Sequence, residues 1–187
     1  GICSHEQIFA SSGAFSEVKC IDIAQNLLNE AHQQSIRKGL DGVMQFEQAN
    51  VYDIELPKDY YDCILFHASL HHFKNVESLL TQKIIPALKP TGHIIINEYI
   101  GKNRMQFQGE QITAINNCLT QIPNEMRKRW KTNLSKDKVS GPGLLRMIVA
   151  DPSECVDSES IIPSLRKHCK ILEESPYGGN LLMYVLK

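Results

Sequence analysis

Four side chains that can carry polar chemistry stand at the ends of runs with a strand pattern. Asp22 lies 21 positions after Gly1, where nucleotide-binding folds place an acid that accepts hydrogen bonds from both ribose hydroxyls. His67 could orient a substrate or take a proton near neutral pH, and Glu98 or Tyr99 could contact a substrate hydroxyl or amine as acceptor or base. The structural alternatives are an Asp that binds amides at a helix start, a hydrogen-bonded core histidine and a strand-end pair that caps the next segment.

Metal binding is the other chemistry that the histidines and cysteines could carry. His71 and His72 are adjacent, so their side chains are expected to diverge, and no carboxylate or cysteine at ligand spacing joins them. The cysteines stand singly, without a CxxC pair or the short spacing of a zinc site; they are Cys3, Cys20, Cys63, Cys118, Cys155 and Cys169. The sequence therefore predicts no metal site, and it predicts free thiols in a reducing cytoplasm.

A scaffold of alternating strands and helices is expected to position these residues. Strands are predicted over 18–23, 43–49, 61–67 and 93–98, and helices over 27–36 and 75–88. Gly39 is the expected stop of the first helix, and Lys89-Pro90-Thr91-Gly92 punctuates the end of the second. This alternation predicts an α/β fold with a Rossmann-like, doubly wound sheet, helices on both faces and ligands at the carboxyl ends of the strands.

The region after residue 98 departs from this alternation. It contains three expected helical segments: an amphipathic stripe, a run that a proline opens and a run that follows a glycine-rich turn. The stripe is Ile112, Ile115, Leu119 and Ile122, and the other two runs are Pro123–Trp130 and Leu144–Ala150. The sequence therefore predicts a helical insertion over 99–151 that acts as a lid.

The C-terminal region is expected to return to the sheet. Ser158 can cap a last helix near Ile161–His168. Cys169–Glu174 and Asn180–Leu186 flank Pro176-Tyr177-Gly178-Gly179, which is the pattern of an antiparallel β-hairpin at a sheet edge. The predicted organisation is a core over 1–98, the insertion over 99–151, and a helix with a hairpin over 152–187 that complete the core.

Composition and charge argue against several classes of partner. The chain has 187 residues, a formal net charge of −1 and a pI near 6.7, so no global field draws it onto nucleic acid or anionic lipid. The basic run Met126–Lys131 is typical of the solvated face of an amphipathic helix. The longest apolar runs fall far short of the roughly 18 residues that a membrane span needs, and no signal peptide is visible. We expect neither a nucleic-acid nor a membrane partner, and the oligomeric state stays open.

An ordered series of short motifs runs through the chain. It comprises Cys20-Ile21-Asp22-Ile23, Ala49-Asn50-Val51, Tyr61-Asp62, Leu70-His71-His72 and Leu88-Lys89-Pro90-Thr91-Gly92. In order and spacing this series resembles the class I S-adenosylmethionine-dependent methyltransferases. The tail motifs Asn97-Glu98-Tyr99-Ile100-Gly101-Lys102-Asn103-Arg104, Asp151-Pro152-Ser153-Glu154 and Pro176-Tyr177-Gly178-Gly179 are similar to a bacterial small-molecule subgroup of the methyltransferase domain 11/12 type. The resemblance implies S-adenosylmethionine as cofactor and a small-molecule acceptor.

The resemblance also implies roles for individual residues. Those implied to bind the cofactor are Gly1, Asp22, Ile23, Asn50, Val51 and His67, and those implied to take part in catalysis are His67, Glu98 and Tyr99. Asn50 stands where the family usually has an Asp that contacts the adenine amino group, and its amide oxygen can accept the same bond, while Val51 offers its backbone amide. The alternative for Asn50 is an ordinary turn residue. His67 would face the sulfonium end of the cofactor.

The glycine loop is where this sequence departs from the family. The family pattern is a strand followed by G-x-G-x-G, whose glycines let the backbone approach the cofactor closely beside a helix N-terminus. Gly1-Ile2-Cys3-Ser4-His5 keeps only the first glycine, and the family's first strand is expected upstream of Gly1. Without such a central strand a sheet splits and exposes two edges.

The sequence thus predicts an enzyme that transfers methyl from S-adenosylmethionine to an O, N or C nucleophile of a small-molecule acceptor. No sharp catalytic signature is expected, because orientation alone can supply about 7–11 kcal/mol. One alternative is a non-catalytic, partner-binding relative whose altered glycine loop no longer holds cofactor. Another is a nicotinamide-dependent oxidoreductase, which would share Asp22, although its G-x-G-x-x-G pattern fails at Cys3 and Glu6.

Overall fold

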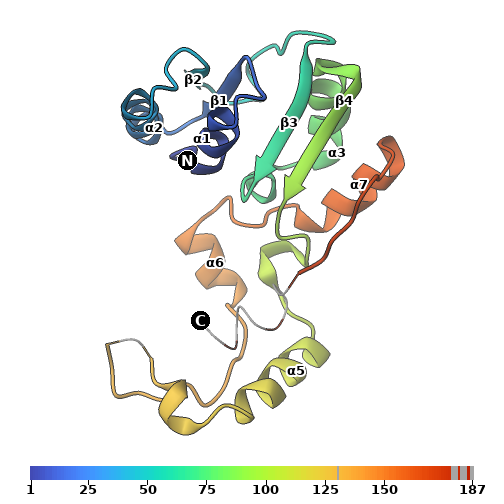
Figure 1. The fold of residues 1–187 in the computed structure, drawn as a ribbon. Coiled ribbons are helices and arrows are strands. Elements are labelled where there is room, and N and C mark those ends of the chain that lie inside the picture. Colours follow the sequence, from blue (N-terminus) through green and yellow to red (C-terminus); the bar gives the residue numbers. More distant parts are fainter. Residues whose placement is uncertain (130, 178–180, 182–184, 186–187) are drawn as a thin grey trace. The chain divides into compact units, whose positions relative to one another are not determined.

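The computed structural model describes residues 1–129, 131–177, 181 and 185, and the chain divides into two compact units. Unit 1 comprises Gly1–Tyr61 with Pro86–Pro90, and unit 2 comprises Asp62–Ile85 with Thr91–Lys187 (Figure 1). The predicted division at residue 98 does not coincide with the boundary between these units. Among the described helices, none is both long enough and apolar enough to cross a membrane.

Unit 1 is built around a strand–helix–strand element. Strand β1 (Val18–Asp22) and strand β2 (Met44–Gln48) pair in parallel, with Val18 opposite Met44 and Asp22 opposite Gln48. Helix α2 (Gln25–Arg37) connects them, as the sequence predicted. Parallel strands need such a crossover connection. Because β1 and β2 run in the same direction, their carboxyl ends lie side by side at one edge of the sheet.

The stop of α2 follows from a glycine in the left-handed conformation. Gly39 has φ +67, which a residue without a Cβ adopts at no steric cost. The turn is closed by hydrogen bonds from the N–H of Gly39 to the carbonyl of Ile36 (3.0 Å) and from the N–H of Leu40 to that of Ser35 (2.9 Å). These bonds satisfy carbonyls that the helix end would otherwise leave open, so the predicted stop at Gly39 is confirmed.

One face of α2 forms the core of unit 1 against the β1–β2 pair. Leu28 is 1% exposed and packs in one cluster with Ala10, Cys20, Leu40 and Met44. Ala10 comes from helix α1 (Ser4–Ser11), which covers the segment where the sequence led us to expect the rest of an altered glycine loop. The first helix is therefore anchored to the same core as β1 and β2.

Unit 2 contains a second two-stranded sheet. It is formed by β3 (Tyr61–His67) and β4 (Leu88–Asn97), whose first residues belong to unit 1 and whose arrows point the same way in Figure 1. Strand β3 has the predicted bounds, whereas β4 begins at Leu88 rather than at His93. Pro90 therefore lies inside a strand, which is tolerated where the missing N–H faces an edge without a ladder partner.

The connection between β3 and β4 is a 3-10 turn followed, after the non-helical residues 73–75, by a helical stretch with a π-helical middle. It runs from the 3-10 turn η1 (Leu70–His72) into α3 (Val76–Leu79), the π-helical η2 (Leu80–Ile84) and α4 (Ile85–Ala87). Its apolar face is buried, with Leu79, Leu80 and Ile84 each at most 2% exposed. The predicted helix over 75–88 is thus confirmed in place, with a π segment that the periodicity did not indicate.

The predicted insertion is helical, but its second segment is shorter than expected. It contains η3 (Asn103–Met105), α5 (Gly109–Thr120), η4 (Asn124–Arg127) and α6 (Leu144–Ala150). The helix predicted over Pro123–Trp130 is limited to η4, since Lys128 leaves the helical region and bridges to Ser135 instead; Trp130 lies outside the described residues. Ile115 and Leu119 of α5 pack with Val139 of the same segment and with Val185 near the C-terminus in one apolar cluster.

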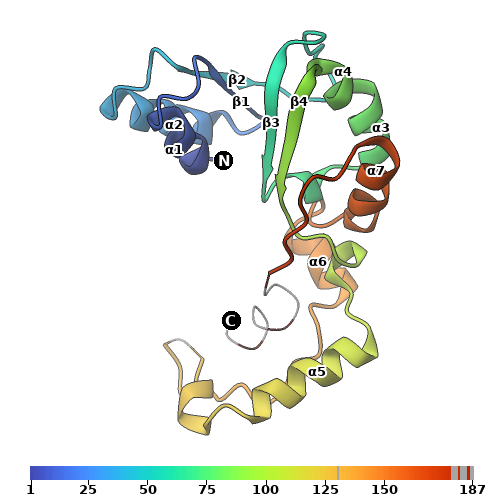
Figure 2. The same ribbon diagram turned by 45° about the vertical axis from the view of Figure 1, so that its right-hand side comes forward.

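The C-terminal region contains η5 (Ser158–Ser160) and α7 (Ile161–His168). Helix α7 lies against α3, and Glu77 of α3 binds Lys167 (2.6 Å) and His168 (2.8 Å) (Figure 2). The last helix is confirmed, but Ser158 lies inside η5, and Ser160 takes the position before α7.

The predicted C-terminal hairpin is not confirmed. Its first strand, Cys169–Glu174, is wrong, because residues 169–177 form no strand. Side chains tie this segment down instead: Arg166 binds Glu174, and the Tyr177 hydroxyl donates to Asn97 at the end of β4. Most of the second predicted strand, Asn180–Leu186, lies outside the described residues.

The prediction of one doubly wound sheet is only partly met. Within the described residues the strands form two separate pairs, β1–β2 and β3–β4. In each pair the two strands follow one another in the chain and are connected by a helical crossover. Consecutive elements usually lie side by side, so each pair forms from neighbouring parts of the sequence. The alternation of strands and helices specified these two units, but it did not specify that they share one sheet.

Candidate functional site

The carboxyl edge of the β1–β2 sheet holds the residues predicted to bind a nucleotide. Asp22 ends β1, and its carboxylate accepts a hydrogen bond at Oδ1 from the N–H of Ala24 (2.8 Å). The backbone nitrogen of Gly1 donates to Oδ2 of the same carboxylate. The structure therefore brings Gly1 and Asp22 together, and each carboxylate oxygen keeps a second lone pair for another donor.

Asn50 lies on the same edge, just after β2. Its Oδ1 accepts from the N–H of Tyr52 (3.2 Å), and its Nδ2 donates to Oδ2 of Asp53 (2.8 Å). These contacts build the turn that the structural alternative expected, and they hold the amide side chain in one orientation. Ile23, directly after Asp22, is 71% exposed at this edge, while the neighbouring Val51 is half-buried.

Cys3 has the backbone conformation of a glycine at the position where the family pattern has its second glycine. Its φ of 51° and ψ of 40° are left-handed, a region that costs an ordinary L-residue roughly 1–2 kcal/mol. Its thiol is hydrogen-bonded to that of Cys20, and this bond together with burial raises the pKa of the Cys20 thiol well above its ordinary value. The turn of a glycine loop is therefore present without the glycine.

In unit 2, Glu98 lies at the centre of a polar cluster directly after β4. Its side chain is fully buried and accepts three hydrogen bonds of 2.5 Å: from the N–H groups of Ser69 and Leu70 at Oε1, and from Nδ1 of His71 at Oε2. Burial, the largest single effect, acts to raise the pKa of Glu98, but the bonds from His71, Ser69 and Leu70 together bring it below its usual value. These contacts favour the structural alternative, in which Glu98 holds the loop after β3.

A second carboxylate reaches the histidine pair from a distant segment. Oε1 of Glu154 lies 3.8 Å from Nε2 of His71, and Oε2 lies 3.8 Å from Nε2 of His72. Burial acts most strongly to lower the pKa of His71, yet the bond to Glu98 and the charges of Glu98, Glu154 and Asp151 together raise it. Sequence spacing predicted that no carboxylate joins the histidine pair, but the fold brings Glu154 to it. His71, His72 and Glu154 together could hold a metal ion.

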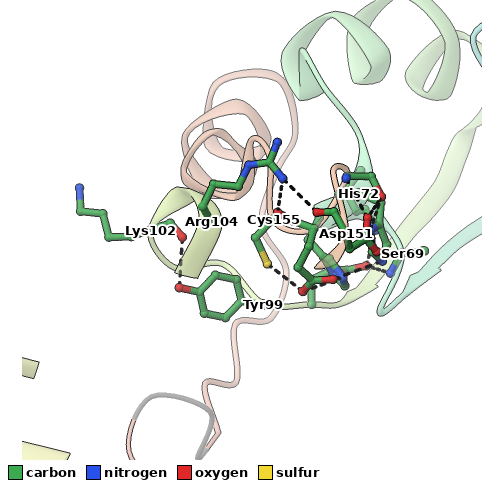
Figure 3. Close-up of polar contacts among 12 residues, drawn as sticks. Ser69, His72, Tyr99, Lys102, Arg104, Asp151 and Cys155 are labelled. Atoms are coloured by element: carbon green, nitrogen blue, oxygen red, sulfur yellow. Dashed lines mark hydrogen bonds and ion pairs between the residues drawn. The ribbon is translucent and has the colours of Figure 1, made fainter. Parts of the chain in front are cut away.

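The segment that carries Glu154 is fixed by backbone contacts. The Arg104 guanidinium donates through Nη1 to the carbonyls of Asp151 (3.4 Å) and Glu154 (3.1 Å), and the N–H of Val156 donates to the carbonyl of His71 (3.2 Å). Figure 3 shows Arg104 beside Cys155, with Asp151, His72 and Ser69 gathered together. No role was predicted for Glu154 or Asp151, although both belong to the Asp151-Pro152-Ser153-Glu154 motif.

His67 and Tyr99 lie at the ends of β3 and β4. The strand ends are joined by the N–H of Ala68, which donates to the carbonyl of Asn97 (2.9 Å), and His67 itself is half-buried. The Tyr99 hydroxyl donates to the carbonyl of Lys102 (3.2 Å) and points away from His72 (Figure 3). Of the residues predicted to take part in catalysis, Glu98 contacts the histidine cluster through its hydrogen bond with Nδ1 of His71.

All six cysteines are free thiols, as predicted. They are distributed over both units, and only Cys118 is exposed.

Comparison with known proteins relates these features to one family. Residues 1–96 match the family described as a methyltransferase domain. The ubiquinone/menaquinone biosynthesis C-methyltransferases UbiE of Yersinia enterocolitica and Erwinia tasmaniensis are each 29% identical over 87 residues, which cover 46% of this chain and 34% of the relative. The matched region thus spans about a third of the length of these curated relatives.

Solved structures show the same fold. An S-adenosylmethionine-dependent methyltransferase of Mesorhizobium loti superposes with a TM-score of 0.50 and 17% identity, over 86% of this chain and 67% of that one. A candidate methyltransferase of Bacillus halodurans superposes with a TM-score of 0.55 and 12% identity, over 92% and 62%. With the family match over 96 of 187 residues, the chain belongs to the methyltransferase domain family, among the class I S-adenosylmethionine-dependent methyltransferases.

Proposed function

We propose that this chain binds S-adenosylmethionine and transfers its methyl group to a small-molecule acceptor. The observation that carries the proposal is that Asp22 and Asn50 lie on one carboxyl edge of the β1–β2 sheet, inside the region that matches the family. Such an edge is where open α/β sheets bind nucleotides. The left-handed turn at Cys3, beside Asp22 through Gly1, fits a cofactor loop of the family type.

In this proposal different residues of the β1–β2 edge bind the ribose and the adenine of the cofactor. Asp22 accepts hydrogen bonds from the ribose hydroxyls with the lone pairs that Gly1 and Ala24 leave open. Asn50 and the amide of Val51 hold the adenine, and the exposed Ile23 supplies apolar surface to it. Because Asn50 is already oriented by its own turn, it loses little entropy on binding.

The bound cofactor supplies an activated methyl group on a sulfonium. The chain then has to orient the acceptor and exclude water, which together are worth up to about 7–11 kcal/mol. His67, half-buried at the end of β3, is the residue that we propose to face the reacting groups and to take a proton from the acceptor where the acceptor loses one. We assign Glu98 to positioning the Ser69–His72 loop, and Tyr99 to the wall of the acceptor site.

Acceptor recognition is assigned to the 99–151 segment. Three apolar side chains of the seven-residue helix α6 are exposed: Leu144 (50%), Leu145 (79%) and Val149 (84%). Exposed apolar side chains that lie together are typical of a binding surface. Ile115, Leu119 and Val139 of the insertion lie in one apolar cluster, to which Val185 also belongs. These features support a lid that presents an apolar face to an apolar small molecule, and the relative UbiE, named a C-methyltransferase, favours a carbon nucleophile.

Calorimetry with S-adenosylhomocysteine tests the cofactor assignment. Asp22→Ala removes the charged hydrogen-bond acceptor, and the loss of even one such bond is worth about 1.5–3 kcal/mol, so we expect the dissociation constant to rise at least roughly 10- to 150-fold. Asp41→Ala, an exposed carboxylate in the turn after α2, is the matched control and should bind as the parent chain does. Equal affinity of the Asp22 variant and the parent would remove the ribose assignment.

The same titration separates the alternatives. Binding of NAD in place of S-adenosylhomocysteine would identify a nicotinamide-dependent oxidoreductase, and binding of neither would identify a non-catalytic relative.

The acceptor assignment is tested on helix α6. A double variant Leu145→Ser/Val149→Ser should keep its circular dichroism and its affinity for S-adenosylhomocysteine, because both side chains are exposed. Release of S-adenosylhomocysteine in a panel of small-molecule acceptors should fall at least about 10-fold in kcat/KM, since each apolar side chain buried on an acceptor contributes about 1.5–3 kcal/mol. Leu134→Ser, 64% exposed elsewhere in the insertion, is the control. Unchanged turnover in the double variant would place acceptor recognition elsewhere.

A further inference from the structure

The histidine pair and Glu154 form a cluster that the proposed methyl transfer does not use. One ligand atom from each of His71, His72 and Glu154, a ring nitrogen from each histidine and a carboxylate oxygen, lie within 4.8 Å of one another. The two nitrogen-to-oxygen distances are both 3.8 Å, which is too long for a hydrogen bond. The three groups therefore surround a common point without bonding one another.

The hydrogen bond at Nδ1 of each imidazole determines the tautomer of the ring. It therefore determines whether Nε2, the nitrogen nearer to Glu154, carries a lone pair. Nδ1 of His71 lies 2.5 Å from Glu98, and a carboxylate can only accept, so this nitrogen carries the proton. Nδ1 of His72 lies 3.0 Å from the Ser153 hydroxyl, which donates its own proton to Asp151 (2.6 Å). Both Nδ1 atoms are thus donors, so each Nε2 of a neutral ring carries a lone pair and lies 3.8 Å from an oxygen of the Glu154 carboxylate.

A cation placed between two imidazole lone pairs and a carboxylate would bind all three groups at once. Two added protons would supply it only by placing two imidazolium rings 4.2 Å apart, centroid to centroid. Such a pair repels strongly at short range in a half-buried setting. One divalent ion satisfies both nitrogens and the carboxylate without that repulsion, and it offsets the charge of Glu98, Glu154 and Asp151.

We propose that His71, His72 and Glu154 bind one divalent transition-metal ion, best fitted by Zn²⁺. Zinc takes imidazole nitrogens and carboxylate oxygens at about 2.0–2.2 Å, so two ligand atoms on a tetrahedral ion stand about 3.3–3.5 Å apart. The two nitrogen-to-oxygen distances of 3.8 Å, one to each oxygen of Glu154, exceed this spacing by a few tenths of an ångström, and the three ligand atoms lie within 4.8 Å of one another. Three protein ligands leave the fourth position to water or to an oxygen of a bound small molecule.

The surroundings have the construction of a metal site. Each ligating histidine donates its other nitrogen to an acceptor, Glu98 for His71 and Ser153 with Asp151 for His72, which fixes ring orientation and raises ligand basicity. Arg104 holds the backbone on both sides of the third ligand through the carbonyls of Asp151 and Glu154. The ion would therefore join the loop after β3 to the segment that follows α6.

Titration of the chelator-treated chain with Zn²⁺ alone tests the site, without any need for methyl transfer. We expect one Zn²⁺ per chain, and at least about 100-fold weaker binding in His72→Gln and in Glu154→Gln, because even outer partners of ligands cost 10–100-fold. His93→Gln and Glu159→Gln are matched substitutions at exposed positions outside the cluster and should leave the affinity unchanged. Circular dichroism confirms that each variant is folded.

A second readout separates this site from adventitious binding by the six cysteines. Co²⁺ in place of Zn²⁺ should give visible bands of a nitrogen and oxygen environment without thiolate charge transfer, and these bands should vanish in Glu154→Gln. Saturating Zn²⁺ should also raise the melting temperature of the parent chain but not that of Glu154→Gln. Absence of stoichiometric binding, or equal binding by the parent and both cluster variants, would overturn the proposal.

Discussion

Removal of the Glu98 carboxylate should destabilise the chain in two distinct steps, because its two oxygens serve different partners. Oε1 accepts from the N–H groups of Ser69 and Leu70, whereas Oε2 accepts from His71. Glu98→Gln can keep its remaining oxygen on the two backbone donors and present its NH₂ to His71, so that one charge-assisted bond is lost. That loss is worth about 1.5–3 kcal/mol.

Glu98→Ala should be far more severe than the amide variant. It leaves all three donors without their acceptor in a fully buried position, at about 1–3 kcal/mol each. The sum, roughly 3–9 kcal/mol, is comparable with the whole stability of a typical domain, about 5–15 kcal/mol. We therefore expect Glu98→Ala to be unfolded or nearly so at room temperature.

Urea unfolding followed by circular dichroism measures both free energies, with Glu55→Gln as the control at an exposed position. A Glu98→Gln variant within about 0.5 kcal/mol of the parent would refute the positioning role. If that variant were as stable as the parent and yet inactive in methyl transfer, Glu98 would be catalytic, as the strand-end position first indicated.

Three further outcomes follow from single positions. Gly101→Ala should displace the Tyr99 ring and lower the melting temperature, because a Cβ there would clash with the Tyr99 hydroxyl and ring, whereas Gly109→Ala, with nothing within 4 Å, should not. Leu28→Ala should cost about 2–5 kcal/mol in urea unfolding, since a side chain 1% exposed leaves a cavity; a loss below 1 kcal/mol would contradict the assigned core. Mass spectrometry after brief alkylation should find Cys118 modified first and Cys20 last, because Cys118 is exposed while Cys20 is buried with a raised pKa; early modification of Cys20 would contradict this order.

The sequence by itself determined the features that depend on neighbouring residues. The strand that ends at Asp22, the helix that stops at Gly39 and the strand Tyr61–His67 were all predicted, because periodicity and a left-handed glycine act within one or two turns of chain. The spacing between Gly1 and Asp22 predicted a ribose-binding acid at the end of β1, and the structure brings these two residues into contact. The ordered motifs likewise indicated the methyltransferase family, which the match over residues 1–96 confirms.

Other features depended on contacts between distant segments, and only the tertiary structure decided them. The pairing of strands into two separate sheets depends on hydrogen bonds along strand edges, which alternation of elements does not specify. The chain after Cys169 carries a hairpin pattern, yet Arg166 and Asn97 hold it by side-chain bonds in place of a ladder. A local pattern states what a segment can form, and the available partners decide which form is stabilised.

The carboxylates that surround His71 and His72 were likewise not predictable from the sequence. Adjacent histidines were expected to diverge, and in sequence no acid stands at ligand spacing from them. The fold brings Glu98 to one ring nitrogen of His71 and Glu154 toward the other, from segments on either side of the insertion. The protonation and orientation of a side chain are set by groups within a few ångströms, and only the tertiary structure brings these distant residues that close.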